Sequence, residues 1–425
     1  MTIKHLFPPA WPTLNLDFAN SKSLDPRITF SRSSIGTYVD ADGIIQTAAD
    51  DEARFDHDPV TGESLGLLVE ESRTNETHPS TFTSASVASS WAIVNDTYII
   101  PDQILSPSGE NTGALLDFDT ANTDGVTFQL NLAANTPQVL GTRVYSAWVK
   151  PVNTGVGTFI SLRFQGAAWS WPDGGTSTRG IRFYFDTKSF EINSSPASSS
   201  NKLAFEEYPN DWYRISIPAT NSGAGYVSIR ANENTAGNCY MWGFQSEEGS
   251  FSTSLIPTSG SAEDRSADVC SIEGDNFTSW FNQAEGTFVG TVGSRSRLLL
   301  SSVSTGPNVY QDTTYSFYSN SESYGASFNL RYEDQSQVLV NYSGWTSSIP
   351  MQNYAGAYSA EGVAGAWEGN LGNPQTPLNK PLQDDLSHMW IGRNHSVTDS
   401  GVQRISRLAY YPTRLSDEQL QALTS

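Results

Sequence analysis

Residues 54–75, RFDHDPVTGESLGLLVEESRTN, gather carboxylates around a single histidine, His57. A carboxylate beside an imidazole can serve as a general acid and base in hydrolysis, and grouped carboxylates can bind a hard cation. The carboxylates of this stretch are Asp56, Asp58, Glu63, Glu70 and Glu71. The same residues are also typical of a rigid polar turn without chemistry, because acidic clusters mostly form solvated or ion-paired networks. The rest of the chain must decide between these alternatives.

Two tryptophans in the segment QGAAWSWPDGG form a second candidate site. Trp169 and Trp171 point to the same face of an extended chain, so their indoles could form a flat platform for sugar rings. The nearby side chains of Asp173, Arg163 and Gln165 could bond sugar hydroxyls. The alternative is a hydrophobic clamp that closes a sandwich edge or packs on a neighbouring subunit.

Short acidic loops supply the candidate metal ligands. Asp117, Asp119 and Asp124 lie in DFDTANTDG, and Asp40 and Asp42 lie in VDADG. Both loops offer the oxygen ligands that calcium requires, but neither has the spacing of an EF-hand, and a solvated turn is the alternative. Zinc is not expected, because no Cys or His pair has ligand spacing. We therefore expect no cofactor, unless calcium binds at one of these loops.

Sequence motifs of catalysis are otherwise missing. The chain has no G-x-S-x-G elbow, no P-loop and no dinucleotide fingerprint, despite 34 glycines. A glycosidase or lyase could use two carboxylates that are distant in sequence, but no candidate stands out. These candidates are Glu206, Glu207, Glu247, Glu248 and Glu368. We therefore expect that the protein is not an enzyme.

The composition restricts the possible partners. Among 425 residues, 45 are acidic and 24 basic, which gives a formal charge of −21 and disfavours binding to nucleic acid or to an anionic membrane surface. No stretch approaches the roughly 20 apolar residues of a membrane span, and the N-terminus lacks the apolar core of a signal peptide. The two cysteines, Cys239 and Cys270, are expected to be reduced and semi-buried, with a single bridge between them as the alternative.

The elements that must position these residues are predicted to be strands. Apolar and polar residues alternate in 14–20, 27–32, 36–47, 143–151, 157–166, 179–187, 212–219 and 225–232, and the segment 36–47 reads as a hairpin that turns at Asp42-Gly43. Trp148, Trp212, Trp242 and Trp390 are expected in the cores. Only the last residues predict a helix, with Ser416 as its N-cap.

The expected fold class is all-β: an N-terminal β segment, two antiparallel jelly-roll β-sandwiches and a short C-terminal helix. A Ser-rich polar hinge at 254–269 separates two apolar blocks of the chain. The predicted divisions are an N-terminal segment at 1–85, a first sandwich at 86–270 and a second sandwich at 271–425.

Three stretches resemble segments that occur together in structural proteins of tailed bacteriophages. Residues 28–75, with FSRSSIGTYVDADG, RFDHDPVTG and GLLVEESRTN, are similar to a long segment of phage fibre and head-spike proteins. Residues 242–269, with QSEEGSFSTSLIPT, resemble the end of a carbohydrate-binding-module-like sandwich. Residues 405–425 resemble the last strand and helix of a laminin-G or concanavalin-like jelly roll.

The resemblance implies a bacteriophage virion protein, a tail or head fibre or a spike, that adheres to a host-surface glycan. It further implies a homotrimer on the virion surface, assembled in the host cytoplasm, whose partners are other virion proteins and host polysaccharide. The 1–85 segment would hold the trimer either to the virion or to its own C-terminal sandwich. The alternatives are a capsid decoration or head-fibre protein without an essential receptor, and a tailspike depolymerase.

In this context a structural role is favoured for the stretch 54–75. Asp58-Pro59 and Thr61-Gly62 predict a turn, because Pro presets φ and Gly62 can adopt a positive φ. Residues 66–69 are then predicted to form a buried strand, and Arg73 is predicted to pair with a neighbouring carboxylate.

Overall fold

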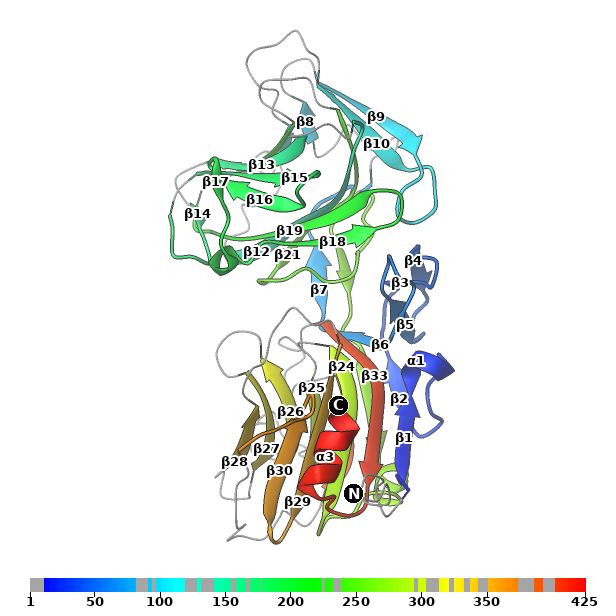
Figure 1. Ribbon diagram of the computed structural model, residues 1–425. Coiled ribbons are helices and arrows are strands. Elements are labelled where there is room, and N and C mark those ends of the chain that lie inside the picture. The colour runs from blue at the N-terminus through cyan, green and yellow to red at the C-terminus, as the bar shows by residue number, and fades with distance from the viewer. Residues whose placement is uncertain are drawn as a thin grey trace.

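The structure is a computed structural model with two β-sandwiches joined by a narrow waist (Figure 1). It describes residues 11–81, 91–93, 97–118, 128–130, 141–153, 158–165, 169–176, 178–223, 226–231, 238–293, 297–302, 313–320, 325–331, 337–342, 351–373, 386–392 and 402–425. All strand pairs between named strands in these ranges are antiparallel, which confirms the predicted all-β class.

The middle sandwich consists of two sheets built from the central part of the chain. One has the order β14 (Trp169–Ser170), β19 (Trp212–Asn221), β12 (Gly141–Pro151), β21 (Cys239–Glu248), β10 (Gly113–Phe118) and β9 (Thr97–Ile104), with β18 (Ala204–Tyr208) also paired to β19. The other has the order β17 (Ser195–Pro196), β16 (Ser189–Ile192), β15 (Arg179–Tyr184), β13 (Phe159–Gln165), β20 (Tyr226–Ala231), β11 (Phe128–Leu130) and β8 (Trp91–Ile93).

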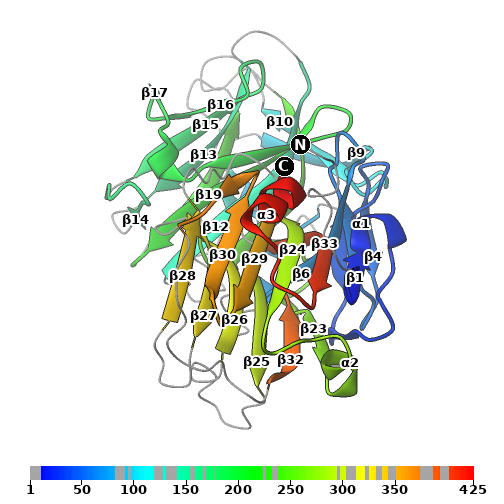
Figure 2. The ribbon, with the colours of Figure 1, turned by 60° about the horizontal axis from the view of Figure 1, so that its bottom comes forward.

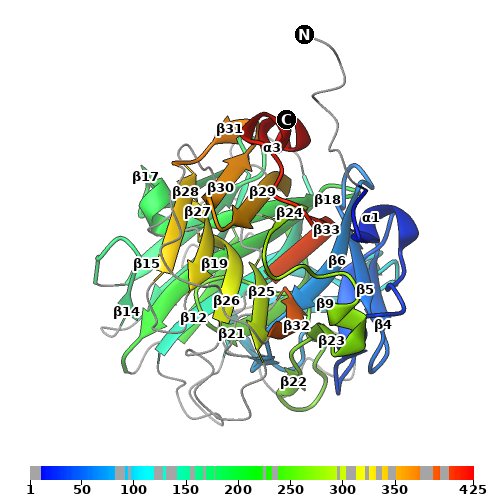
Figure 3. The same ribbon diagram turned by 90° about the horizontal axis from the view of Figure 1, so that it is seen from below.

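The terminal sandwich combines strands from both ends of the described chain. Its first sheet has the order β31 (Asn370–Leu371), β30 (Gly362–Trp367), β29 (Met351–Ser359), β24 (Gly286–Gly293), β33 (Val402–Tyr411), β6 (Ser64–Glu70) and β5 (Arg54–His57), with β1 (Leu14–Asp17) on β33. Its second sheet has the order β2 (Thr29–Ser31), β23 (Val269–Glu273), β32 (Leu386–Ile391), β25 (Arg297–Ser302), β26 (Thr313–Asn320), β27 (Gly325–Arg331) and β28 (Gln337–Tyr342). Figures 2 and 3 show the strands of these two sheets as two neighbouring rows.

The N-terminal strands therefore belong to the same sandwich as the C-terminal strands. The second half of β33 pairs with β1, and its first half pairs with β6. Leu14, Leu16, Leu67 and Val69 are fully or almost fully buried in the core of this sandwich. The described N-terminal strands are thus attached to the C-terminal sandwich, and attachment of this segment to a virion stays a prediction.

Two hairpins and a few helices complete the fold. The hairpin of β3 (Gly36–Val39) and β4 (Ile45–Ala48) turns at Asp42-Gly43, as predicted, and β7 (Arg73–Asn75) pairs with β22 (Glu263–Arg265) at the waist. The short helical turns are α1 (Phe18–Ser21), η2 (Ser199–Asn201) and α2 (Asp275–Thr278). Within the described residues, no helix has the length and apolar character needed to cross a membrane.

The predicted C-terminal helix is confirmed as α3 (Asp417–Thr424). Ser416 caps it, because its hydroxyl accepts a hydrogen bond from the Gln419 N–H while the Gln419 side chain accepts one from the Ser416 N–H. Leu420 is fully buried against an alanine-rich face of β29 and β30. The helix therefore covers the outer face of one sheet of the terminal sandwich (Figure 1).

Three of the four tryptophans predicted as core residues are buried. Trp148, Trp212 and Trp242 pack with Val39 and Ile45 of the β3–β4 hairpin, so they fill the contact between the middle sandwich and this hairpin. The prediction for Trp390 is wrong. The alternation of β32 turns its neighbours to the core and leaves this indole half-exposed beside His388.

The two cysteines are free and lie in different sandwiches. Cys239 and Cys270 are both buried rather than semi-buried. Burial raises the pKa of the Cys239 thiol to about 12, so this thiol is protonated and unreactive at neutral pH.

The assignment of β1 to the terminal sandwich predicts a clear effect of a single substitution. Leu16→Ala should lower the free energy of unfolding of the terminal sandwich by about 2–5 kcal/mol, because it leaves a cavity in the core. Asn15→Ala, in the same strand but exposed, is the matched control. Urea unfolding followed by tryptophan fluorescence measures both, and equal stability of the two variants would show that β1 is not part of this core.

Candidate binding cavity between the two sandwiches

A network of buried ion pairs lies at the waist. Arg54 donates from Nη1 to Glu70 at 2.7 Å and from Nη2 to Asp268 at 2.5 Å. Arg32 donates to the other oxygen of Asp268 at 3.0 Å, and Arg265 lies 3.0 Å from Glu70. All five side chains are at most 1 % exposed. A sixth, Glu247, is also buried and lies within electrostatic reach of Arg265, so three arginines are balanced by three carboxylates.

The electrostatics of the network hold the Glu70 carboxylate ionised. Burial alone would raise the pKa of Glu70, but the guanidinium groups of Arg265 and Arg54 hold its pKa far below the usual range. Burial acts to lower the pKa of Arg54, and the carboxylates of Asp268 and Glu70 raise it above its usual value. Glu70 and Arg54 therefore stay charged from neutral pH down into the acid range.

The network fastens the linker, residues 249–268, to the N-terminal strands. Ser254 donates to Glu70 from its backbone N–H at 2.8 Å and from its hydroxyl at 2.6 Å. Arg265 donates to the carbonyl oxygen of Glu71 at 2.6 Å, and the Glu70 N–H donates to Asp268 at 2.7 Å. The linker is thus held in one path between the two sandwiches.

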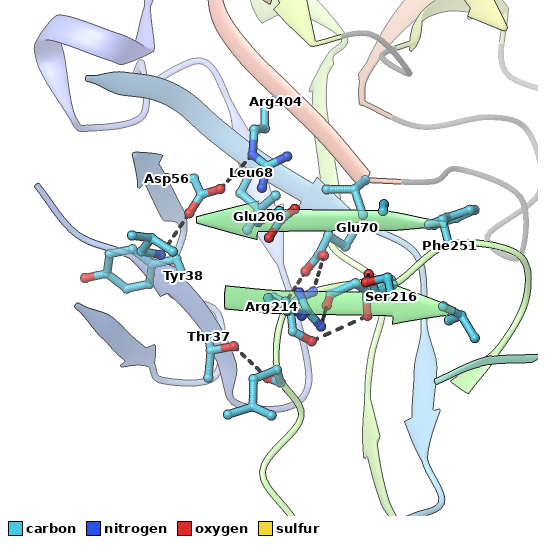
Figure 4. Close-up of a pocket in the computed structure, with 18 of the residues that line it drawn as sticks. Thr37, Tyr38, Asp56, Leu68, Glu70, Glu206, Arg214, Ser216, Phe251 and Arg404 are labelled. Atoms are coloured by element: carbon cyan, nitrogen blue, oxygen red, sulfur yellow. Dashed lines mark hydrogen bonds and ion pairs between the residues drawn. The ribbon is translucent and has the colours of Figure 1, made fainter. Parts of the chain in front are cut away.

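Beside the network lies a cavity of about 280 Å³ (Figure 4). Its floor is the outer face of β18, β19 and β12 in the middle sandwich. Its other walls come from the β3–β4 hairpin, from β5, β6 and β33 of the terminal sandwich, and from linker residues 250–255. Four segments that are distant in sequence therefore meet around one space.

Charged and hydroxyl groups line much of this cavity. Arg404 of β33 donates to Asp56 of β5 at 2.7 Å, and Figure 4 shows Glu206 between this pair and Arg214. Within the described residues the exposed Glu206 carboxylate accepts no hydrogen bond and makes no ion pair. Tyr208 faces the same space from β18. The lining thus mixes aromatic surface with donors and acceptors.

The two tryptophans of the predicted sugar platform do not face solvent. Trp169 and Trp171 are 2 % and 6 % exposed and belong to the core of the middle sandwich. Phe164 packs edge-on against both indoles, with ring centroids 5.1 and 5.0 Å away, and Arg179 lies over Trp171. The two indoles are therefore packed as a hydrophobic clamp and do not form an exposed platform.

The polar residues predicted beside the platform have other contacts or lie partly outside the description. Asp173 accepts hydrogen bonds from Arg179 and Asn201, and the hydrogen bond from Arg179 lowers its pKa. Arg163 is half-buried in β13, and the side chain of Gln165 lies outside the described residues. Their role in glycan binding stays a prediction.

The predicted calcium ligands are not brought together in the described part of the chain. Asp119 and Asp124 lie outside it, and only the backbone of Asp117 is described. Asp40 uses its carboxylate to accept from the N–H groups of Asp42 and Ile44 in the hairpin turn. Within the described residues no group of three metal-ligating side chains converges. Calcium binding therefore stays a prediction.

The acidic stretch 54–75 has the predicted structural role. Asp58 accepts from the N–H groups of Val60 and Thr61 in a turn closed by Gly62, whose φ is +69°. The His57 ring bonds the Val39 carbonyl oxygen at 3.0 Å. The predicted buried strand is β6, and Arg73 pairs with Glu71. These carboxylates are thus used for folding.

The residues around the cavity were not identified from the sequence. Glu206 is one of five carboxylates that the sequence does not distinguish, and Arg214 stands at a polar position of β19, where alternation predicts an outward side chain. It is nevertheless 5 % exposed, because the linker covers that face of the strand. A polar residue that is buried although it lies on the outward face of a strand indicates such a covered site. Its burial, however, is known only from the fold.

Comparison with known proteins gives no family. No family model matches the chain. No curated protein matches it. A carbohydrate-binding module of a Ruminococcus gnavus sialidase, CBM40 bound to α2,3-sialyllactose, has 15 % identity and a TM-score of 0.30, over 35 % of this chain and 88 % of that one.

Other solved structures are similarly distant. The receptor-binding domain of botulinum neurotoxin mosaic serotype C/D has 10 % identity and a TM-score of 0.27, over 36 % of this chain and 38 % of that one. A CBM22 tandem of Paenibacillus barcinonensis Xyn10C has 7 % identity and a TM-score of 0.27, over 81 % and 99 %. Likeness of this degree identifies neither a family nor a ligand.

The network predicts a large penalty for removing one carboxylate. Glu70→Gln should lower the free energy of unfolding by about 3–5 kcal/mol, because Arg54 and Arg265 would keep buried charges without their partner. Glu63→Gln, an exposed position near the start of the same strand, is the control and should change stability by less than about 0.5 kcal/mol. Chemical denaturation at pH 7 measures both. Similar losses in the two variants would contradict a buried network.

The lowered pKa of Glu70 also predicts how stability depends on pH. Its folded pKa lies below its unfolded value, so its contribution is complete above the unfolded pKa and is lost as pH falls toward the folded pKa. Between pH 4.5 and 3 the free energy of unfolding of the wild-type protein should fall by up to about 1.4 kcal/mol per pH unit more than that of Glu70→Gln. Denaturation curves across this range give both slopes, and parallel slopes would contradict the assignment.

Proposed function

We propose that this protein is a non-enzymatic structural part of a bacteriophage virion, a fibre or spike. The cavity between its two sandwiches, which we call the junction cavity, binds a host-surface glycan. The observation that carries the binding proposal is the cavity itself: a mixed polar and aromatic space that four chain segments surround. The network beside it holds the walls in fixed positions. Such preorganisation lowers the entropic cost of binding.

The size and lining of the cavity suit one sugar residue. At about 280 Å³ it lies just below the roughly 300–1,000 Å³ of pockets that enclose drug-sized ligands. Tyr208 offers aromatic surface for the apolar face of a sugar ring, and Glu206 and Arg404 offer an acceptor and a donor for hydroxyls. We expect the site to take a terminal or branch sugar of a polysaccharide.

The charges in the cavity favour binding over hydrolysis. A glycosidase commonly needs two available carboxyl groups, one on each side of the scissile bond. Asp56 is already bonded to Arg404 and to the Val39 N–H, and Glu70 to two arginines. Glu206 is then the one lining carboxylate without a hydrogen-bond partner in the described residues. This leaves a binding site without the second carboxylate.

The virion assignment rests on the sequence resemblance, and a rigid two-sandwich unit suits it. Homotrimers displayed on the virion surface would present several copies of a weak site, and multivalency would raise the total affinity without new contacts. The partners would be other virion proteins and host polysaccharide. A capsid decoration protein without an essential receptor is the first alternative, and a depolymerase is the second.

Filling the cavity tests the proposal. Ala204 is an exposed residue of β18 that lines the cavity, so Ala204→Trp should block the site without entering a core. Ser195→Trp, exposed on the other sheet of the middle sandwich, is the control. Fluorescently labelled protein is applied to an array of bacterial surface polysaccharides and to bacteria with and without periodate oxidation.

We expect the protein to bind a glycan, and periodate to abolish this binding. Ala204→Trp should weaken the binding about tenfold or more, and Ser195→Trp should leave it unchanged. Binding to assembled capsids and to no glycan would favour the decoration protein. Release of reducing ends or unsaturated products from a bound polysaccharide would favour the depolymerase. Equal glycan binding by the two tryptophan variants would place the site outside the cavity.

A further inference from the structure

Arg214 is a buried cation without a carboxylate partner in the described structure. Its side chain is 5 % exposed, and its guanidinium carbon lies 4.3 Å from the centre of the Trp148 ring. Its Nη2 donates to the Thr253 carbonyl oxygen at 2.6 Å and to the Ser146 hydroxyl at 3.2 Å, while its Nε has no partner among the described residues. These contacts fix the plane of the guanidinium but do not neutralise it.

The other buried arginines of the described chain differ from Arg214 in this respect. Arg32, Arg54, Arg143 and Arg265 each form an ion pair with a carboxylate. An unpaired buried charge is costly, so a fold normally supplies its counter-ion. Arg214 lines the junction cavity, and that is where a counter-ion can reach it.

The charge balance of the cavity points in the same direction. Its cationic lining residues are Lys202, Arg214 and Arg404, and its anionic ones are Asp56, Glu70 and Glu206. Glu70 is already neutralised by the arginines of the network behind the wall. Arg404 is paired with Asp56, which leaves Arg214 as the buried lining cation without a carboxylate partner among the described residues, within a chain whose formal charge is −21.

We infer that the sugar bound in the junction cavity carries a carboxylate, as uronic acids do, and that Arg214 is the residue that binds it. The inference rests on the proposed function and specifies its ligand class. A planar guanidinium with free donors matches the two oxygens of a carboxylate. Stacking on Trp148 holds this guanidinium in a fixed orientation.

Glu206 limits the affinity of the junction cavity for an acidic sugar. It stands directly opposite Arg214 on the neighbouring strand, and its carboxylate lies near the entering ligand without forming an ion pair with Arg214. A negative charge there repels a sugar acid while still accepting a hydrogen bond from a hydroxyl. Removing the charge should therefore strengthen binding of an acidic sugar and not of a neutral one.

Matched pairs of monosaccharides test the inference. Glucuronate and glucose, galacturonate and galactose, and mannuronate and mannose differ at one carbon, and titration calorimetry or saturation-transfer NMR on the full chain compares them. At least one acid should bind about tenfold or more tightly than its neutral partner. That preference should fall as salt is raised, and Ala204→Trp should remove it.

Two exposed substitutions avoid the risk that a change at buried Arg214 prevents folding. Glu206→Gln should raise the affinity for the acid several-fold, and Lys202→Gln should lower it. Glu207→Gln is the matched control, because Glu207 neighbours Glu206 but pairs with Lys188 on the other face of the strand. Arg214→Met, if folded by circular dichroism, should abolish the preference for the acid.

The outcomes separate this inference from the proposed function. Equal binding of acid and neutral sugars, or no gain from Glu206→Gln, overturns the carboxylate assignment while sugar binding in the cavity stands. Failure of all six monosaccharides to bind overturns the assignment as well. In that case glycan binding itself is decided separately by the periodate and Ala204→Trp experiments.

Discussion

Six charged side chains sealed from water at the waist are the constraint on which the remaining structure depends. Taking three arginines and three carboxylates out of solvent is expensive, and the cost is offset only when all partners are present in good geometry. The partners come from the N-terminal strands, from the linker between the sandwiches and, for Glu247, from β21 of the middle sandwich. A fold that satisfies this network therefore brings those segments to one place and excludes alternative paths for the linker.

The cavity follows from the same constraint. Glu70 belongs to the network and also lines the cavity, and Ser254 of the linker is bonded to Glu70 and lines the cavity as well. The outer face of β18 and β19 is thus covered by chain that the ion pairs hold in place. The binding surface depends on contacts that never touch a ligand, which is common where a site must be preorganised.

The sequence was sufficient to predict local structure, but it did not predict which distant residues contact one another. Alternation predicted the strands, and cap and turn residues predicted the helix at Ser416 and the turn at Asp58–Gly62, because these signals act over a few residues. Spacing placed Trp169 and Trp171 on one face but could not say that this face is the core. The pairing of Arg54 with Asp268 and the covering of Arg214 join distant segments, so no local pattern indicates them.

The most direct measurement is hydrogen–deuterium exchange with mass spectrometry on the full chain, with and without a bound bacterial polysaccharide. We predict that protection increases together in three segments that meet at the cavity: residues 37–39, 202–208 and 250–255. Protection confined to the loop around residues 169–176, with no change at these three segments, would contradict a glycan site at the junction.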